Sequence, residues 1–153
     1  MKQRNSNKIL LLIIFLSAVT LLIFILSSLF FSEKRQAEQA VDQFYEYEQN
    51  GLFSESWEMF HPLMQDKFPK GEYLEDRPHV FFNHFGVSTF SYSINEISKV
   101  EDWYMEEGST VIPVAYKVSI SQRFKSKYGN FSIYQSVYAT EVDGEWRILW
   151  NYH

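Results

Sequence analysis

Hydrophobic and polar positions follow three successive patterns along this chain of 153 residues. The first is an unbroken apolar run, ILLLIIFLSAVTLLIFILSSLFF, which covers residues 9–31 and contains no charged side chain. As a helix with a rise of about 1.5 Å per residue, this run would be roughly 34 Å long, enough to cross the hydrocarbon core of a bilayer. The pattern therefore predicts a transmembrane helix over residues 9–31.

A helical pattern follows, in which apolar residues recur every three or four positions. The first amphipathic helix is expected over residues 34–50. Gly51 directly after it suits the C-terminal end of a helix, because glycine takes positive φ without steric strain. The side of this helix that we expect to be buried carries Ala37, Ala40, Val41, Phe44 and Tyr47 or Glu48.

Two further helical segments are expected before Gly86. The second helix should begin with Ser54 as its N-cap, and Pro62 should limit or bend it because proline has no backbone N–H. The third segment covers roughly residues 72–84, and Pro78 should divide it into two short pieces. The sequence thus predicts three helices between the apolar run and Gly86.

After Gly86 the apolar residues alternate with polar ones, which is typical of half-buried antiparallel strands. Asp143 and Gly144, between two such runs, favour a tight type I′ hairpin. A strand of about twelve residues would reach roughly 40 Å, more than the diameter of about 35 Å expected for so small a body, so the strands must bend. We therefore predict an α+β domain with three helices in the concave side of a bent antiparallel sheet, whose strands lie near residues 90–94, 114–124, 130–142 and 145–152.

The charges that flank the apolar run predict its orientation. Three basic residues precede it, namely Lys2, Arg4 and Lys8. This excess predicts residues 1–8 in the cytoplasm, residues 9–31 as an uncleaved anchor in the lipid bilayer, and residues 32–153 as one extracytoplasmic domain. A cleaved signal peptide is the alternative, but its apolar region would be about half as long. The chain has no cysteine to carry a lipid, which excludes a lipoprotein.

The part of the chain beyond the apolar run is strongly acidic. Three of the 14 Lys and Arg residues precede that run, so 11 remain beyond it against 19 Asp and Glu residues, a net charge near −8. A body with this charge is repelled by phosphate backbones and by anionic lipid headgroups. Nucleic-acid binding is therefore not expected.

Two stretches of the body resemble a known superfamily. They are FYEYEQNGLFSESWEMFHPLMQDKF at residues 44–68 and DGEWRILW at residues 143–150. Both resemble the nuclear transport factor 2-like superfamily. The order of helices, then strands, behind an anchor is most similar to the N-terminal domain of the methicillin-resistance transpeptidases and to small bacterial envelope proteins that carry it. The resemblance implies a cone-shaped α+β fold.

The resemblance does not by itself imply one activity, because the superfamily includes isomerases, dehydratases, dimerisation modules and domains without activity of their own. In the transpeptidases, a catalytic region follows with a Ser-x-x-Lys nucleophile motif. This chain contains no Ser-x-x-Lys, so it cannot be such an enzyme. No cofactor is expected.

The stretch EDRPHVFFNHFG, residues 75–86, concentrates candidate chemistry. Glu75 and His79 are four residues apart and could meet on a helix, but His84 would lie on another side, so no metal site is predicted. A simpler interpretation is that the apolar residues of this stretch close the wide end of the cone. Asp76 and Arg77 would then form an exposed ion pair at its rim.

Acid-base chemistry inside the cone is the alternative that the resemblance implies. In superfamily enzymes a carboxylate or a histidine, often with a tyrosine donor, moves a proton next to a carbonyl group, and burial tunes its pKa. The residues of this chain that could point inward are His61, Tyr73, Asp76 and His84. A small isomerase or dehydratase is therefore an alternative function.

Aromatic residues suggest where a partner could bind. Tyr134 and Tyr138 are expected on one outer face of the third strand, among serine and threonine side chains, a composition favoured at protein interfaces. A small ligand could instead enter the cone near Phe81, His84 and Phe85. Three tryptophans are interpreted as core packing rather than ligand stacking, namely Trp57, Trp146 and Trp150.

These observations favour a membrane-anchored, non-catalytic, extracytoplasmic domain of the bacterial cell envelope. It would bind an envelope protein or a second copy of itself, or a small ligand. A structural subunit of a larger envelope complex is a further alternative.

Overall fold

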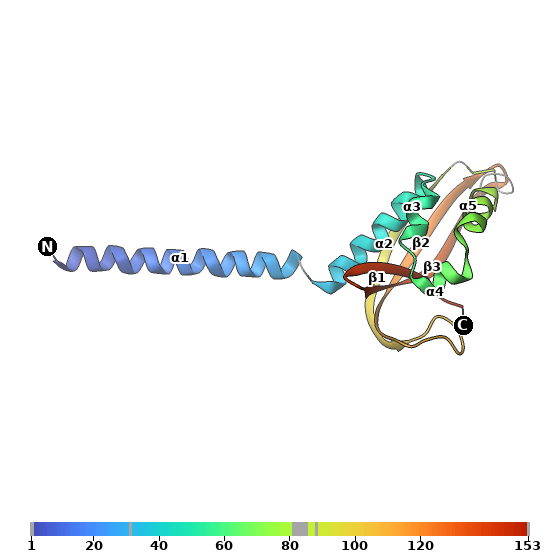
Figure 1. Cartoon of the computed structure of the whole chain (residues 1–153). Coiled ribbons are helices and arrows are strands. Elements are labelled where there is room, and N and C mark those ends of the chain that lie inside the picture. The colour runs from blue at the N-terminus through green and yellow to red at the C-terminus, as the bar shows by residue number, and fades with distance from the viewer. Residues whose placement is uncertain (1, 31, 81–85, 88, 153) are drawn as a thin grey trace. The chain divides into compact units, whose positions relative to one another are not determined.

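The computed structural model describes residues 2–30, 32–80, 86–87 and 89–152 (Figure 1). In the first helix, the side chains described are those of residues 12–26 and 28. The chain divides into two compact units, Met1–Arg35 and Gln36–His153. The second unit contains the sheet and the helices that pack on it.

The first unit contains helix α1, Lys2–Phe30. Its large apolar side chains between Leu12 and Leu26 are exposed. Within the described residues, however, no helix combines the length and the apolar character needed to cross a membrane. The membrane-spanning role expected for residues 9–31 is thus not supported by the structure, and it stays a prediction.

Helix α2, Glu33–Gln49, confirms the first amphipathic helix. Its buried stripe repeats at helical spacing and ends in a carboxylate, with Ala37, Val41, Phe44, Tyr45 and Glu48. Gly51 has φ of +72°, in the left-handed region where a side chain would be strained. The predicted end of this helix is therefore confirmed.

The second predicted helix is wrong in its extent, because two short helices occupy its place. Helix α3, Phe53–Glu58, follows Leu52 as N-cap residue, so Ser54 is not the cap. Helix α4, Pro62–Lys67, begins at a proline. Backbone N–H groups in the first turn of a helix have no acceptor within the helix, so the missing N–H of proline costs nothing there. The described residues of the body therefore form four α-helices, α2 to α5, where three were expected.

The chain between α3 and α4 pairs with the sheet instead of continuing the helix. Phe60 forms a parallel bridge with Ile148 of the last strand. The N–H of His61 donates to the carbonyl of Ile148 at 3.0 Å, and the N–H of Ile148 donates to the carbonyl of Met59 at 2.8 Å. These bonds are not helical, which explains why α3 stops at Glu58.

Helix α5, Lys70–Pro78, corresponds to the start of the third predicted segment. Helix α5 ends at Pro78, the residue at which the segment was expected to divide. Residues 81–84 of the predicted segment lie outside the described residues, so its division into two pieces is not tested.

The four predicted strands are confirmed as one antiparallel sheet in the order β1-β2-β3-β4. Asp143 and Gly144 have φ of +53° and +83°, as a type I′ hairpin requires. The register of β1 shifts between Ile94 and Glu96, so this edge strand is irregular there. The strand bounds are Phe90–Trp103, Ile112–Ser126, Gly129–Val142 and Glu145–Trp150.

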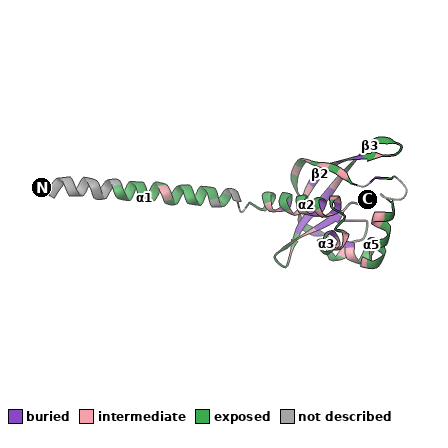
Figure 2. Ribbon diagram, turned by 90° about the horizontal axis from the view of Figure 1, so that it is seen from above, coloured by how far each residue is buried: buried purple, intermediate pink, exposed green. Residues whose placement is uncertain are grey.

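Most of the core lies between the sheet and helices α2 to α5 (Figure 2). Its centre is aromatic: the Phe60 ring lies 5.2 Å from that of Phe44 and 5.1 Å from that of Trp150. Trp57, Trp146 and Trp150 are partly buried and pack against this core, as the sequence predicted. The α+β class is confirmed.

Candidate functional site

A buried carboxylate is the main polar feature of the core. The Glu48 side chain, from the last turn of α2, is only 1% exposed. Its Oε1 accepts hydrogen bonds from the Ser56 hydroxyl at 2.5 Å and from the Tyr73 hydroxyl at 2.7 Å. Its Oε2 accepts from Nε of Arg77 at 2.6 Å. We call these four residues the Glu48 network.

Helix periodicity brings the Glu48 network together. Glu48 lies four residues after Phe44, at the end of the buried stripe of α2. Tyr73 and Arg77 are also four residues apart, so both project from one side of α5. Ser56 is the buried residue of α3. Three helices therefore meet at one carboxylate.

The charges of the Glu48 network are mutually stabilised. Burial raises the pKa of the Tyr73 hydroxyl, and the Glu48 carboxylate raises it further. Burial alone would lower the pKa of Arg77, but the Glu48 carboxylate outweighs it, so that the pKa is raised and the guanidinium stays charged. The guanidinium also lies 5.3 Å from the centroid of the Trp150 ring.

This arrangement is chemically suited to joining helices. A general base must present a lone pair to its substrate, whereas the Glu48 carboxylate is inaccessible and already accepts three hydrogen bonds. Breaking a buried ion pair leaves an uncompensated charge, so such a contact holds its helices together strongly.

The expected ion pair between Asp76 and Arg77 is wrong. Asp76 is exposed, whereas the Arg77 side chain is 18% exposed and pairs with Glu48. Adjacent residues of a helix point about 100° apart, so neighbours in sequence do not face each other. Tyr73, predicted as an inward-pointing donor, is buried and belongs to the Glu48 network.

The other acid-base candidates are placed separately. His61 is the N-cap of α4, where its Nδ1 accepts from the N–H of Leu63 at 3.1 Å. Burial lowers the pKa of His61, and the charge of Arg147 lowers it further. Phe81, His84 and Phe85 lie outside the described residues.

Lowering the pH should reveal the role of His61. Because its pKa in the folded state is below the ordinary value of 6.5, the unfolded chain takes up the proton first. The free energy of unfolding should therefore fall as the pH is lowered from about 6.5 toward the folded-state pKa. His61→Asn, which keeps a capping side chain, should show a smaller fall than the unaltered chain.

Urea unfolding at pH 7 and pH 5 measures this difference. His79→Asn, which changes an exposed histidine, is the control and should retain the pH dependence of the unaltered chain. The same pH dependence in the unaltered chain and in His61→Asn would contradict the prediction.

Tyr134 and Tyr138 lie on the same face of β3, as expected, but only Tyr134 is exposed. Tyr134 is 77% exposed, but Tyr138 is 6% exposed and stacks on Trp103, with ring centroids 4.0 Å apart. Trp103 ends β1 directly after Asp102, whose φ of +50° departs from strand geometry. The predicted face is therefore corrected to Tyr134 alone.

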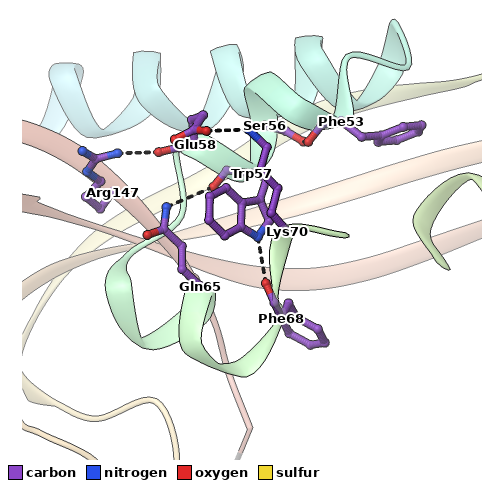
Figure 3. A network of polar contacts seen from close by, with 8 residues as sticks. All are labelled: Phe53, Ser56, Trp57, Glu58, Gln65, Phe68, Lys70 and Arg147. Carbon is purple, nitrogen blue, oxygen red and sulfur yellow. Dashed lines mark hydrogen bonds and ion pairs between the residues drawn. The ribbon is translucent and has the colours of Figure 1, made fainter. Parts of the chain in front are cut away.

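A second polar cluster surrounds Trp57 and joins α3, α4 and α5 (Figure 3). The indole Nε1 of Trp57 donates to the carbonyl of Phe68 at 2.7 Å. Lys70 lies 5.4 Å from the centroid of the indole ring and pairs with Glu58 at 2.6 Å. Trp57 thus packs and orients helices, which agrees with its interpretation as a core residue.

Two open hollows mark the surface of the body. One, of about 260 Å³, is lined by Thr89, Phe90, Ser91, Arg123 and Lys125. The other, of about 520 Å³, is lined by Gln43, Tyr47, Glu55, Glu58, Met59, Glu145, Trp146 and Arg147. In the part of the chain that the structure describes, no group of three or more His, Asp or Glu side chains could hold a metal ion.

The fold and these contacts define a class: an α+β domain whose described residues form helices α2 to α5 and a four-stranded antiparallel sheet, with α2, α3 and α5 joined through a buried carboxylate. No family model matches the chain, and no curated protein matches it either. The function must therefore be argued from the residues and contacts of the chain itself.

Proposed function

We propose that this chain is a membrane-anchored, non-catalytic domain of the bacterial cell envelope, which binds a protein partner through the face of β3 that carries Tyr134. Residues 1–8 would lie in the cytoplasm, residues 9–31 in the bilayer, and residues 32–153 outside. The partner would be another envelope protein or a second copy of the chain.

The anchor is supported by sequence and exposure together. Residues 9–31 contain no charge, and basic residues precede them. The side chains from Leu12 to Leu26 expose large apolar surface, which needs a covering medium or partner. These described residues alone give about 22 Å of helix, so the proposal rests on the sequence of the whole segment.

Membership of the nuclear transport factor 2-like superfamily is part of the proposal. It is supported by the element order, in which all the helices of the body precede the strands. It is also supported by the packing of the helices on one face of an antiparallel sheet that ends in the strand Glu145–Trp150. The two sequence stretches that carry the resemblance lie in α2 to α4 and in β4.

A non-catalytic role is supported by the state of the acid-base candidates that the structure describes. Glu48 is buried and accepts three hydrogen bonds, and Nδ1 of His61 caps α4. Asp76 is exposed, and no described contact joins it to Glu48 or His61. An isomerase or dehydratase would need such a group at a site open to substrate.

The exposure of Tyr134 is the observation that carries the proposed interface. A tyrosine that is 77% exposed on a sheet face is available to a partner, and tyrosine is enriched at interfaces. It lies beside Ser121 of β2, with Ser132 and Ser136 before and after it on the same face of β3. Strand β4 pairs only with Val137–Val142, so β3 has no β4 neighbour at Tyr134.

Changing Tyr134 to Glu tests this interface. The charge should oppose burial against a partner, and we expect at least a tenfold loss of cross-linked complex in intact cells, a loss of about 1.4 kcal/mol in binding. Tyr128→Glu is the matched control, because Tyr128 is 79% exposed but lies in the β2–β3 turn.

Equal yields from the unaltered chain and Tyr134→Glu would contradict the proposal, as would equal losses from both variants. A captured product of twice the chain mass would identify the partner as a second copy.

A further inference from the structure

One part of the sheet carries positive charges and no carboxylates in an otherwise acidic body. Residues 108–140, which contain β2 and most of β3, include four Lys or Arg residues and no Asp or Glu. Residues 77–95, which lead into β1, also have no Asp or Glu. The strands themselves therefore carry cations and no carboxylate at the end of the sheet where β1 begins and β2 meets β3. On the core side of this end, Asp42 of α2 accepts a hydrogen bond from the Tyr92 hydroxyl at 2.7 Å.

Two of these cations lie side by side on the face of β2 that points away from the core. Phe124 is fully buried, so its neighbours Arg123 and Lys125 both point outward, where they are exposed. Two residues along a strand separate them by roughly 7 Å. Register places Ser91 and Ser132 on either side of Arg123.

Outward positions of β1 and β2, together with the residues at the start of β1, line a concave site. The hollow of about 260 Å³ is lined by Thr89, Phe90, Ser91, Arg123 and Lys125; we call it the basic hollow. Among the ion pairs of the described residues, none involves Arg123 or Lys125. Residues 81–85 and 88, which are not described, include no Asp or Glu that could neutralise them.

The donors of the basic hollow suit an oxyanion such as phosphate. The guanidinium of Arg123 presents a planar fork that matches two phosphate oxygens, and the ammonium of Lys125 adds a second charge. The exposed hydroxyl of Ser91 can add a further hydrogen bond. The Thr89 hydroxyl instead donates to the carbonyl of Gln49 at 2.8 Å, so it forms part of the rim.

We propose that the basic hollow binds phosphate groups of an extended, hydroxyl-rich anionic polymer, such as a phosphate-linked polyol or sugar chain. An open hollow on a strand face admits a chain that passes along it, and the polar side chains beside the cations can contact hydroxyl groups. A flat bilayer surface cannot enter a hollow, whereas a single flexible chain can. The site depends neither on the anchor nor on the protein partner proposed above.

The test uses the full chain in nonionic detergent and a fluorescently labelled glycerol-phosphate oligomer of about ten repeats, with binding followed by anisotropy. The double variant Arg123→Gln/Lys125→Gln should bind at least tenfold more weakly than the unaltered chain. The slope of log affinity against log salt should decrease by about 1.4, because two phosphate contacts are lost. The control, Lys70→Gln/Lys99→Gln, removes two charges whose side chains are 37% and 47% exposed, and affinity should change less than twofold.

A third variant keeps the test independent of folding. Arg123→Lys retains the charge but loses the planar fork, and it should bind at least threefold more weakly than the unaltered chain with the same unfolding midpoint. Equal affinities of Arg123→Lys and the unaltered chain would contradict phosphate recognition by the fork.

Competition identifies the source of the anion. Unlabelled glycerol-phosphate oligomer should displace the label at a concentration at least tenfold lower than polyglutamate of equal charge. Displacement by polyglutamate at the same concentration would reduce the site to general charge attraction and overturn the proposal. Displacement by phosphatidylglycerol micelles at a lower phosphate concentration would assign the hollow to lipid headgroups and also overturn it. Equal weakening in both double variants would exclude a local site.

Discussion

Replacing Glu48 with Gln should lower the free energy of unfolding by about 3 kcal/mol, because it leaves the Arg77 guanidinium without its buried counter-charge. Glutamine has nearly the same shape as glutamate, so packing changes little and the effect reports on charge. The three hydrogen bonds at Glu48 are 2.5 to 2.7 Å long, and the side chain of Glu48 is 1% exposed. Urea unfolding in nonionic detergent, followed by tryptophan fluorescence, measures the change.

An exposed ion pair of the same length provides the control for Glu48. Lys70 and Glu58 are also 2.6 Å apart, but their side chains are 37% and 61% exposed. Solvent screening makes such pairs weak, so Glu58→Gln should change the free energy of unfolding by less than about 1 kcal/mol. Equal effects of Glu48→Gln and Glu58→Gln would contradict the importance assigned to burial.

A compensating change separates charge from packing. In the double variant Glu48→Gln/Arg77→Met, both members of the ion pair are neutral, so no uncompensated charge is buried. The double variant should therefore be more stable than Glu48→Gln alone. A double variant that is less stable by the full sum of the two single changes would show that the residues act independently, contrary to the geometry of the Glu48 network.

Replacing Phe60 with Ala should lower the free energy of unfolding by about 4 kcal/mol, because it opens a cavity in the centre of the core. Phe60 is fully buried, and its ring lies 5.2 Å from Phe44, 5.3 Å from Tyr73 and 5.1 Å from Trp150. The change touches α2, α5 and β4 at once, so relaxation of one element cannot fill the space.

Tyr128→Ala is the control for Phe60→Ala. Tyr128 is 79% exposed, and removal of its ring should change the free energy of unfolding by less than about 0.5 kcal/mol. The same urea measurement compares the two variants. A change below about 1 kcal/mol in Phe60→Ala would contradict the placement of Phe60 at the centre of the core.

The sheet could be predicted from sequence because its signals are local. Along β2, from Tyr116 to Phe124, buried positions alternate with less buried ones, and the Asp143–Gly144 turn needs residues that accept positive φ. The extent of the second helix could not be predicted in this way. Phe60 leaves the helical pattern because its neighbours bond to Ile148, which lies 88 positions away, and local propensity does not encode that contact.

The candidate site was predicted only in part for the same reason. Tyr73 was expected to point inward, but its acceptor was not identified, because the contact with Glu48 depends on how α5 packs against α2. Glu48 lies at helical spacing from Phe44, so the sequence indicated it as one of two possible last residues on the buried side of α2. Arg77 was assigned to its sequence neighbour instead, and the burial of Tyr138 under Trp103 had no signal in the alternating pattern.

The bridge between Phe60 and Ile148 has a consequence for how copies of this chain can associate. The N–H and C=O groups of Ile148 that point away from β3 bond to Met59 and His61. At that position the last strand has no vacant backbone groups on which a foreign strand could pair. We therefore expect any edge-to-edge pairing of strands between copies to begin elsewhere on the sheet. Residues 59–61 cover the edge of β4 at Ile148 and so protect that edge against aggregation.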